Sequence, residues 1–74
     1  MFEIKVRFET IEDIKSFHKA ITDIDCDVDA IKGSYVVDAK SMMGLLSMDL
    51  SDGITLVFHT NNLMLSTKFE AWKI

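Results

Sequence analysis

The densest set of possible metal ligands in the chain is four alternating aspartates: Asp23, Asp25, Asp27 and Asp29. Calcium loops of the EF-hand type also place ligands at alternating positions, but they need glycine at the sixth position and glutamate at the twelfth. Counted from Asp23, those two positions hold Val28 and Ser34. The alternation is instead typical of the solvated face of a strand, so we predict no metal site there and no cofactor.

Three other side chains could act as nucleophiles or bases, namely Cys26, His18 and His59. Cys26 has no adjacent base or cation to activate its thiol, so we expect a small core residue. His18 lies in the middle of a helical pattern, away from the cations or helix amides that would stabilise a phosphoryl group. His59 follows a strand pattern and is expected on the face away from the helices. The sequence therefore predicts no enzyme.

Composition indicates one globular domain spanning residues 1–74. The chain is 49% hydrophobic, with a mean hydropathy of +0.19, which argues against disorder. A single cysteine allows no internal disulfide, so we expect a reducing cytoplasm. No stretch approaches the roughly 18 apolar residues of a membrane span. A net charge of −4 disfavours nucleic acid, because affinity for phosphates comes from lysine and arginine.

The first half of the chain predicts a strand, a helix and a hairpin. Phe2 to Phe8 alternates apolar and charged residues, which is typical of a half-buried strand. From Thr10, the expected N-cap, the spacing changes to three and four, which predicts one helical stripe: Ile11, Ile14, Phe17, Ile21 and Ile24. Alternation returns at 25–30 and at 35–39, on either side of a tight turn at Gly33.

The second half predicts a short helix, a fourth strand and a final helix. Ser41 is the expected N-cap of a sulfur-rich helix within 40–50. Residues 54–60 alternate as a strand, and residues 61–74 would form a helix that is capped by Asn62, with Leu65, Phe69 and Trp72 on one face. The predicted order β-α-β-β-α-β-α favours a two-layer α+β sandwich, with a four-stranded, mostly antiparallel sheet and helices on one face.

The run Lys-Ser-Met-Met-Gly-Leu-Leu-Ser-Met, at 40–48 between two strands, resembles the regulatory-helix segment of the HPr family. These proteins are the histidine phosphocarriers of the bacterial sugar phosphotransferase system. The resemblance implies their open-faced sandwich, with the same element order, over nearly the whole chain.

The resemblance breaks at the catalytic motif. Aligning Ser41 with the regulatory serine of the family places Thr10 where the phosphoryl-accepting histidine stands, and Glu12 and Asp13 replace the arginine and proline of the motif. Both the nucleophile and the positive charge that would hold a phosphoryl group are missing. The resemblance therefore implies a member that has lost phosphocarrier activity.

The predicted second helix carries more apolar residues than one buried stripe accommodates. In the family, residues after the regulatory serine form an apolar docking patch, which corresponds to Met42, Met43 and Leu46 and leaves Leu45 and Met48 for the core. Flexible methionines suit a surface that meets several partners. The alternative is that all five pack beneath the sheet or the C-terminal tail.

Ser41 also has two interpretations. It is a plain N-cap, or it is in addition a regulatory phosphorylation site for the dedicated serine kinase of the family. The leading hypothesis is a regulatory module that binds phosphotransferase-system enzymes, a serine kinase or a transcriptional regulator. Two alternatives remain open. The first is a working phosphocarrier that uses His18 or another unconventional acceptor, and the second is a structural domain whose exposed methionines pair with a second copy. We expect a monomer or a weak homodimer.

Overall fold

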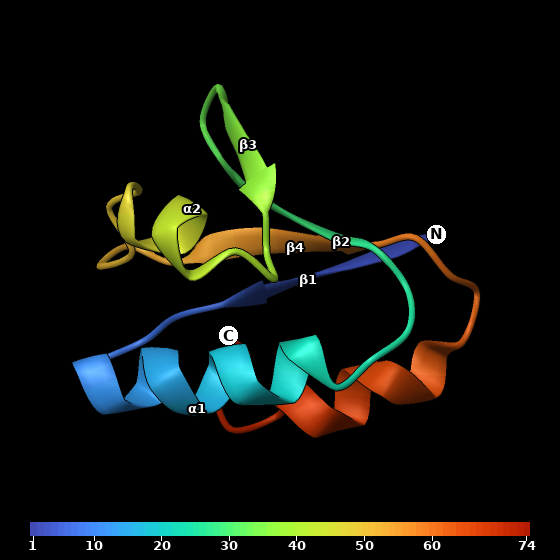
Figure 1. Cartoon of the computed structure of the whole chain (residues 1–74). Coiled ribbons are helices and arrows are strands. Elements are labelled where there is room, and N and C mark those ends of the chain that lie inside the picture. Colours follow the sequence, from blue (N-terminus) through green and yellow to red (C-terminus); the bar gives the residue numbers. More distant parts are fainter.

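Four strands form one antiparallel sheet in the computed structural model, which describes residues 1–74. They are β1 (Phe2–Val6), β2 (Val28–Lys32), β3 (Tyr35–Asp38) and β4 (Ile54–Phe58). Their order across the sheet is β1-β4-β2-β3, so the last strand lies between the first and second (Figure 1). The predicted α+β class with a four-stranded antiparallel sheet is confirmed.

The register gives the sheet one buried face. Leu56 lies opposite Ile4 on one side and Ala30 on the other, and Ala30 lies opposite Val37. The first three are buried and Val37 packs against the same core. Residues of the other face are more polar and at least partly exposed: Glu3, Lys5, Asp29, Ile31, Val36, Asp38, Thr55 and Val57. The helices therefore need to cover only one side.

Helix α1 (Ile11–Thr22) begins as predicted. The Thr10 hydroxyl accepts a hydrogen bond from the Asp13 amide at 3.1 Å, while the Asp13 carboxylate accepts one from the Glu9 amide at 3.0 Å. Phe17 and Ile21 are fully buried. Ile11, the first residue of the predicted stripe, is 59% exposed at the first turn, whereas the other four residues of the stripe are buried.

The β2–β3 hairpin closes with the two-residue loop Gly33-Ser34. Gly33 has φ of 60°, whereas Ser34 has no positive φ, a pattern that corresponds to a type II′ turn with glycine at its first central position. A side chain at Gly33 would be strained in this conformation. β2 begins at Val28 and not at residue 25, so the earlier aspartates lie in the connection from α1.

The C-terminal segment differs from the predicted helix. Asn62 is the cap as expected, but the helix that follows, η1 (Leu63–Phe69), is a 3-10 helix. The chain then straightens beside β1: the Arg7 amide donates to the Trp72 carbonyl at 2.8 Å and the Ile74 amide donates to the Lys5 carbonyl at 3.0 Å. Trp72 is therefore not on a helical face, because its backbone bonds with the strand edge.

An aromatic cluster packs between the sheet and the helices α1 and η1, which lie together below the sheet in Figure 1. The Phe17 ring lies 4.9 Å from Phe8 and 5.7 Å from Phe69, and Phe69 lies 5.5 Å from Phe58. Trp72 meets Phe17 edge-on at 5.8 Å. These contacts join β1, α1, β4 and the C-terminal segment. No helix of the structure has the length and apolarity to cross a membrane.

Two of the three isoleucines of α1, Ile21 and Ile11, offer a matched test of this packing. Ile21→Val should lower the free energy of unfolding by about 0.5–1.5 kcal/mol, because a methyl group leaves a filled core. Ile11→Val should change it by less than about 0.5 kcal/mol, as expected for an exposed site. Urea unfolding followed by Trp72 fluorescence measures both. Equal losses at the two positions would contradict this orientation of α1.

Candidate functional site

The second helix, α2 (Met42–Leu46), is short and begins at a serine cap. The Ser41 hydroxyl accepts a hydrogen bond from the Gly44 amide at 3.1 Å. A Cβ built at Gly44 would lie 3.3 Å from the Cβ of Val37, so glycine allows the helix to approach β3 closely. Figure 1 shows α2 beside β3, apart from α1 and η1. The cap at Ser41 therefore fixes the start of the helix, and Gly44 allows its close packing against β3.

The apolar residues of this segment divide between the core and the solvent. Leu45 and Met48 are buried, as predicted. Met43 is 84% exposed and Leu46 is 54% exposed, whereas Met42 is half-buried and packs against the core. The structure thus exposes two of the three predicted docking residues to solvent, and the third is partly buried against the core. The alternative in which all five pack inward is wrong.

A pair of hydrogen bonds ties the start of α2 to α1. His18 Nε2 lies 2.8 Å from the carbonyl oxygen of Lys40, and the ammonium of Lys40 donates to the carbonyl of Ile24 at 2.6 Å. This contact holds the His18 ring against Lys40, the residue before Ser41. The sequence pattern placed His18 in the middle of a helix but gave no sign of this contact, because the two residues are 22 positions apart.

The start of α1, around Thr10, is acidic. The hydroxyl of Thr10 accepts the helix amide of Asp13, and Asp13 in turn accepts from Glu9. The Nη2 of Arg7 lies 3.8 Å from the carboxylate of Glu9. A hollow of about 390 Å³ beside this pair is lined by Arg7, Glu9, Asp13, Ala71, Trp72, Lys73 and Ile74. Its two cations and two carboxylates are of opposite sign, so the hollow has no excess of positive charge that would attract a phosphate.

His59 lies on the open face, as expected. Its Nε2 is 2.8 Å from Asp29 Oδ2, and Asp29 lies directly opposite Asp38 in the sheet. Asp27 completes the lining of a shallow hollow there. In the whole structure, no group of three or more histidine, cysteine, aspartate or glutamate side chains is arranged to hold a metal ion. Cys26 is a half-buried free thiol.

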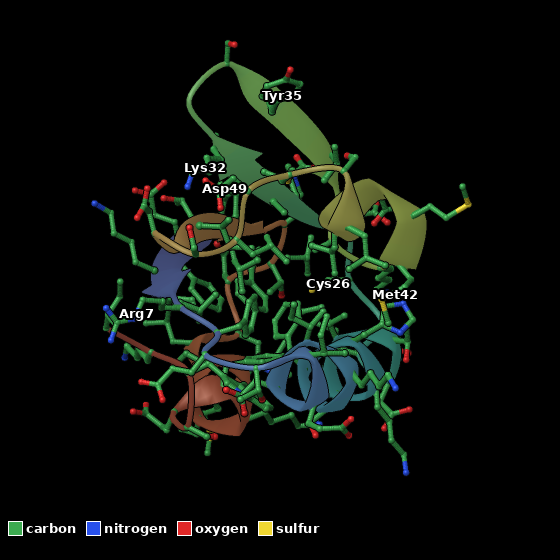
Figure 2. All side chains as sticks on the ribbon, turned by 90° about the vertical axis from the view of Figure 1, so that its left-hand side faces the viewer. Arg7, Cys26, Lys32, Tyr35, Met42 and Asp49 are labelled. Carbon is green, nitrogen blue, oxygen red and sulfur yellow. The ribbon has the colours of Figure 1, made fainter.

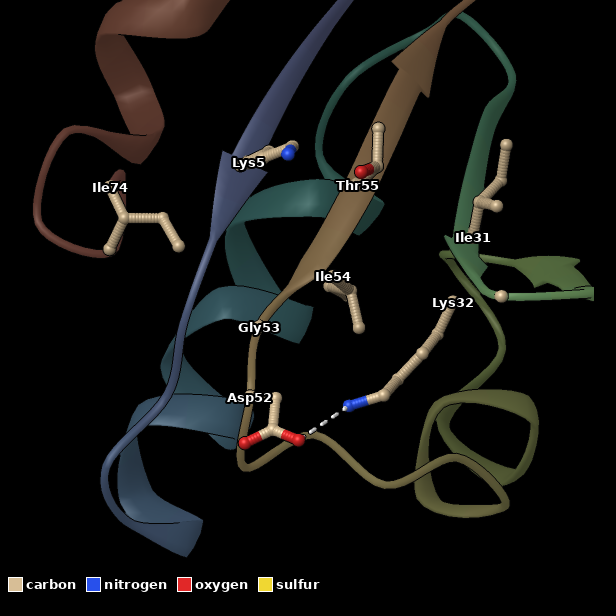
Figure 3. Close-up of a pocket in the computed structure, with 9 residues that line it drawn as sticks. Lys5, Ile31, Lys32, Asp52, Gly53, Ile54, Thr55 and Ile74 are labelled. Atoms are coloured by element: carbon tan, nitrogen blue, oxygen red, sulfur yellow. Dashed lines mark ion pairs between the residues drawn. The ribbon is translucent and has the colours of Figure 1, made fainter.

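A hollow of about 190 Å³ opens at the other end of this face, beside Lys32 (Figure 3). The Lys32 side chain extends from β2 toward the loop before β4, and its ammonium lies 3.7 Å from the Asp52 carboxylate. That distance is too long for a hydrogen bond, and the covered ammonium has no other hydrogen-bond partner. The positive charge of Lys32 therefore attracts the carboxylates of the loop electrostatically, without a hydrogen bond.

Asp49 experiences the same loop environment. The hydroxyl and the amide of Ser51 both donate to its Oδ1, at 2.6 and 3.0 Å. These hydrogen bonds, and to a smaller extent the positive charge of Lys32, hold the pKa of Asp49 below the ordinary value of 3.8. The turn that follows α2 is thus stabilised by the ionised form of Asp49.

Ser51→Ala should raise the pKa of Asp49 toward 3.8, and Lys32→Met should raise it by less, because the hydrogen bonds are the larger cause. A lowered pKa in the folded state stabilises the protein above the pKa of the unfolded chain, and this contribution is lost as pH falls through the folded pKa. Carboxyl-carbon NMR titration measures both shifts. Ser47→Ala is the matched control, since that hydroxyl bonds to Gly44 and not to Asp49. A larger rise in Lys32→Met than in Ser51→Ala would contradict this order of causes.

No family model, curated protein or solved structure matches this chain. The basis for a function is therefore the residues themselves. The most distinctive feature among them is a short capped helix with apolar side chains on both its core and solvent sides.

Proposed function

We propose that this chain is an HPr-like module that has lost phosphocarrier activity and that binds other proteins through α2. The observation that carries the proposal is the exposure of Met43 and Leu46 on a helix whose Leu45 is fully buried. Large apolar side chains that remain in solvent beside a filled core favour a contact with another protein. The long, unbranched methionine adapts to more than one partner surface.

The architecture supports the family part of this proposal. The element order β-α-β-β-α-β is the order that the HPr resemblance implies, and the helices pack against one face of an open antiparallel sheet. Only the last element departs from it, because η1 is a 3-10 helix and the chain then follows β1. The segment with the clearest sequence resemblance, residues 40–48, also contains two of the exposed apolar residues of the chain, Met43 and Leu46.

The loss of phosphoryl transfer is supported by the chemistry around each possible acceptor. Thr10 lies among carboxylates and its hydroxyl is a helix cap. The Nε2 of His18 is engaged with the Lys40 carbonyl, and the Lys40 ammonium is engaged with the Ile24 carbonyl. His59 is paired with Asp29. None of these sites combines a free acceptor with a cation or helix amides that would stabilise transferred charge.

The partner would be a protein with an apolar groove that accepts Met43 and Leu46, with Met42 at its margin. By the resemblance, phosphotransferase-system enzymes, a serine kinase or a transcriptional regulator are the classes to test, in the cytoplasm. Ser41 remains the candidate for regulation. Its hydroxyl is exposed, and a phosphate in its place would keep an acceptor near the first amides of α2 while adding negative charge beside the docking residues.

Incubation with phosphoenolpyruvate and enzyme I of the phosphotransferase system should leave the 8.4 kDa mass of the chain unchanged. The reason is that no acceptor in the structure has the electrostatics for transfer. Intact-mass spectrometry reads the result, with a histidine-containing HPr in the same reaction as the positive control. An acid-labile phosphoryl adduct on this chain would contradict the proposal, and its disappearance in His18→Ala would identify the acceptor.

Met43→Asp should reduce the partner captured from the native cytoplasm by at least about tenfold. Burying a methionine side chain stabilises a contact by about 1.5–3 kcal/mol, and about 1.4 kcal/mol corresponds to tenfold in affinity. Pull-down with quantitative mass spectrometry measures the change. Met64→Asp is the matched control, because that methionine is also exposed but lies on η1. Equal capture by wild type and Met43→Asp would exclude α2 as the docking surface.

A further inference from the structure

The two edge strands of the sheet, β1 and β3, differ in how far other segments pair with their outer edges. The outer edge of β1 is partly covered by the C-terminal residues, which exchange two backbone hydrogen bonds with it and form a bridge between Val6 and Lys73. β3 pairs with β2 alone, and no other segment follows its outer side. Figure 2 shows the tip of this hairpin at the top of the molecule, on the far side from α1 and with α2 beside the base of β3. The outer edge of β3 is therefore open.

The hairpin geometry identifies which backbone groups are unpaired at this edge. The two-residue loop makes Lys32 and Tyr35 the closing hydrogen-bonded pair, after which paired and unpaired positions alternate. The Ala39 amide donates to the Val28 carbonyl at 2.9 Å, which continues the same alternation. Val36 thus directs both its N–H and its C=O away from β2, as a donor and an acceptor for another strand.

The side chains at this edge lack most of the usual protection against strand pairing. Free edges normally carry lysine, proline or a bulge. Here Tyr35 is 65% exposed and Val36 is 60% exposed, and the only charge on the strand is Asp38 at its end. Met43 adds exposed apolar surface from α2, which packs against β3 beside Val37. The short length of β3 is its main safeguard.

We propose that β3 is the edge by which two copies of this chain join, antiparallel, with Val36 opposite the partner's Val36. This register forms two hydrogen bonds between the two valines and extends the cross-strand pair of Ile31 and Val36 into one apolar row across the joined sheets. Tyr35 then lies opposite the partner's Val37, on the face that α2 covers. The surface thus pairs with itself, a condition for a two-fold interface.

The charges at the edge permit this pairing between two copies. In this register Asp38 lies opposite the partner's Ser34, so the two aspartates do not face one another and no like charges meet across the ladder. The interface is small, below the roughly 800 Å² per partner of a standard interface, so association is weak. Each copy carries a net charge of −4. Salt should therefore strengthen the dimer by screening the repulsion between copies.

Sedimentation equilibrium of the full chain over a range of concentrations tests the proposal without reference to any other partner. The wild type should shift from 8.4 kDa toward twice that mass as concentration rises, and more so at higher salt. Val36→Lys and Val36→Glu should each remain monomeric, because two like charges would then face each other. An equimolar mixture of the two variants should recover the dimer, since residue 36 meets residue 36 with opposite charge.

Val57→Lys is the control for stacking between open sheet faces. Val57 lies on the open face of the central strand β4, between Glu3 and Asp29, so the added lysine leaves the β3 edge unchanged and dimerisation should persist. Circular dichroism verifies that each variant is folded. A wild type that is monomeric at every concentration overturns the proposal and leaves the edge to a strand of another protein. A dimer that survives Val36→Lys, or a mixture that fails to associate, also overturns it.

Discussion

The packing of Phe17 against the buried face of the sheet is the contact on which the rest of the structure depends. Its ring lies against Phe8, Phe69 and Trp72, so one side chain of α1 joins the end of β1 to the C-terminal segment. A chain of 74 residues can bury only one such layer. The opposite face of the sheet consequently remains at least partly exposed.

This single layer also explains the form of α2. The core beneath it has room for Leu45, Met48 and part of Met42, because Val37 already lies close to Gly44. The other apolar side chains of the helix have no interior to enter. Their exposure is thus a consequence of a small core combined with an apolar sequence. Exposed apolar patches of this kind often mark a contact with another protein.

The charged and polar contacts differ between the two ends of α1. At its start, Thr10 and Asp13 satisfy backbone amides while Glu9 and Glu12 add negative charge, so the cap serves the helix and disfavours an anionic ligand. Toward its end, His18 contacts the carbonyl of Lys40 and fixes the approach to Ser41. The same helix therefore carries carboxylates at its start and supports the segment that we propose as the docking surface.

The sequence by itself determined the element types, the caps at Thr10, Ser41 and Asn62, and the burial of Leu45, because alternation, helical spacing and local hydrogen bonds act between near neighbours. Only the tertiary structure decided the exposure of Ile11 and the backbone hydrogen-bond partner of Trp72. Ile11 fits the apolar stripe but lies beyond the edge of the core, and Trp72 exchanges helical bonds for the edge of β1, 65 residues away. The bond of His18 to Lys40 and the open edge of β3 likewise depend on which strands and helices meet. Contacts between distant residues leave no periodic signal in the sequence, so these features became visible only in the folded chain.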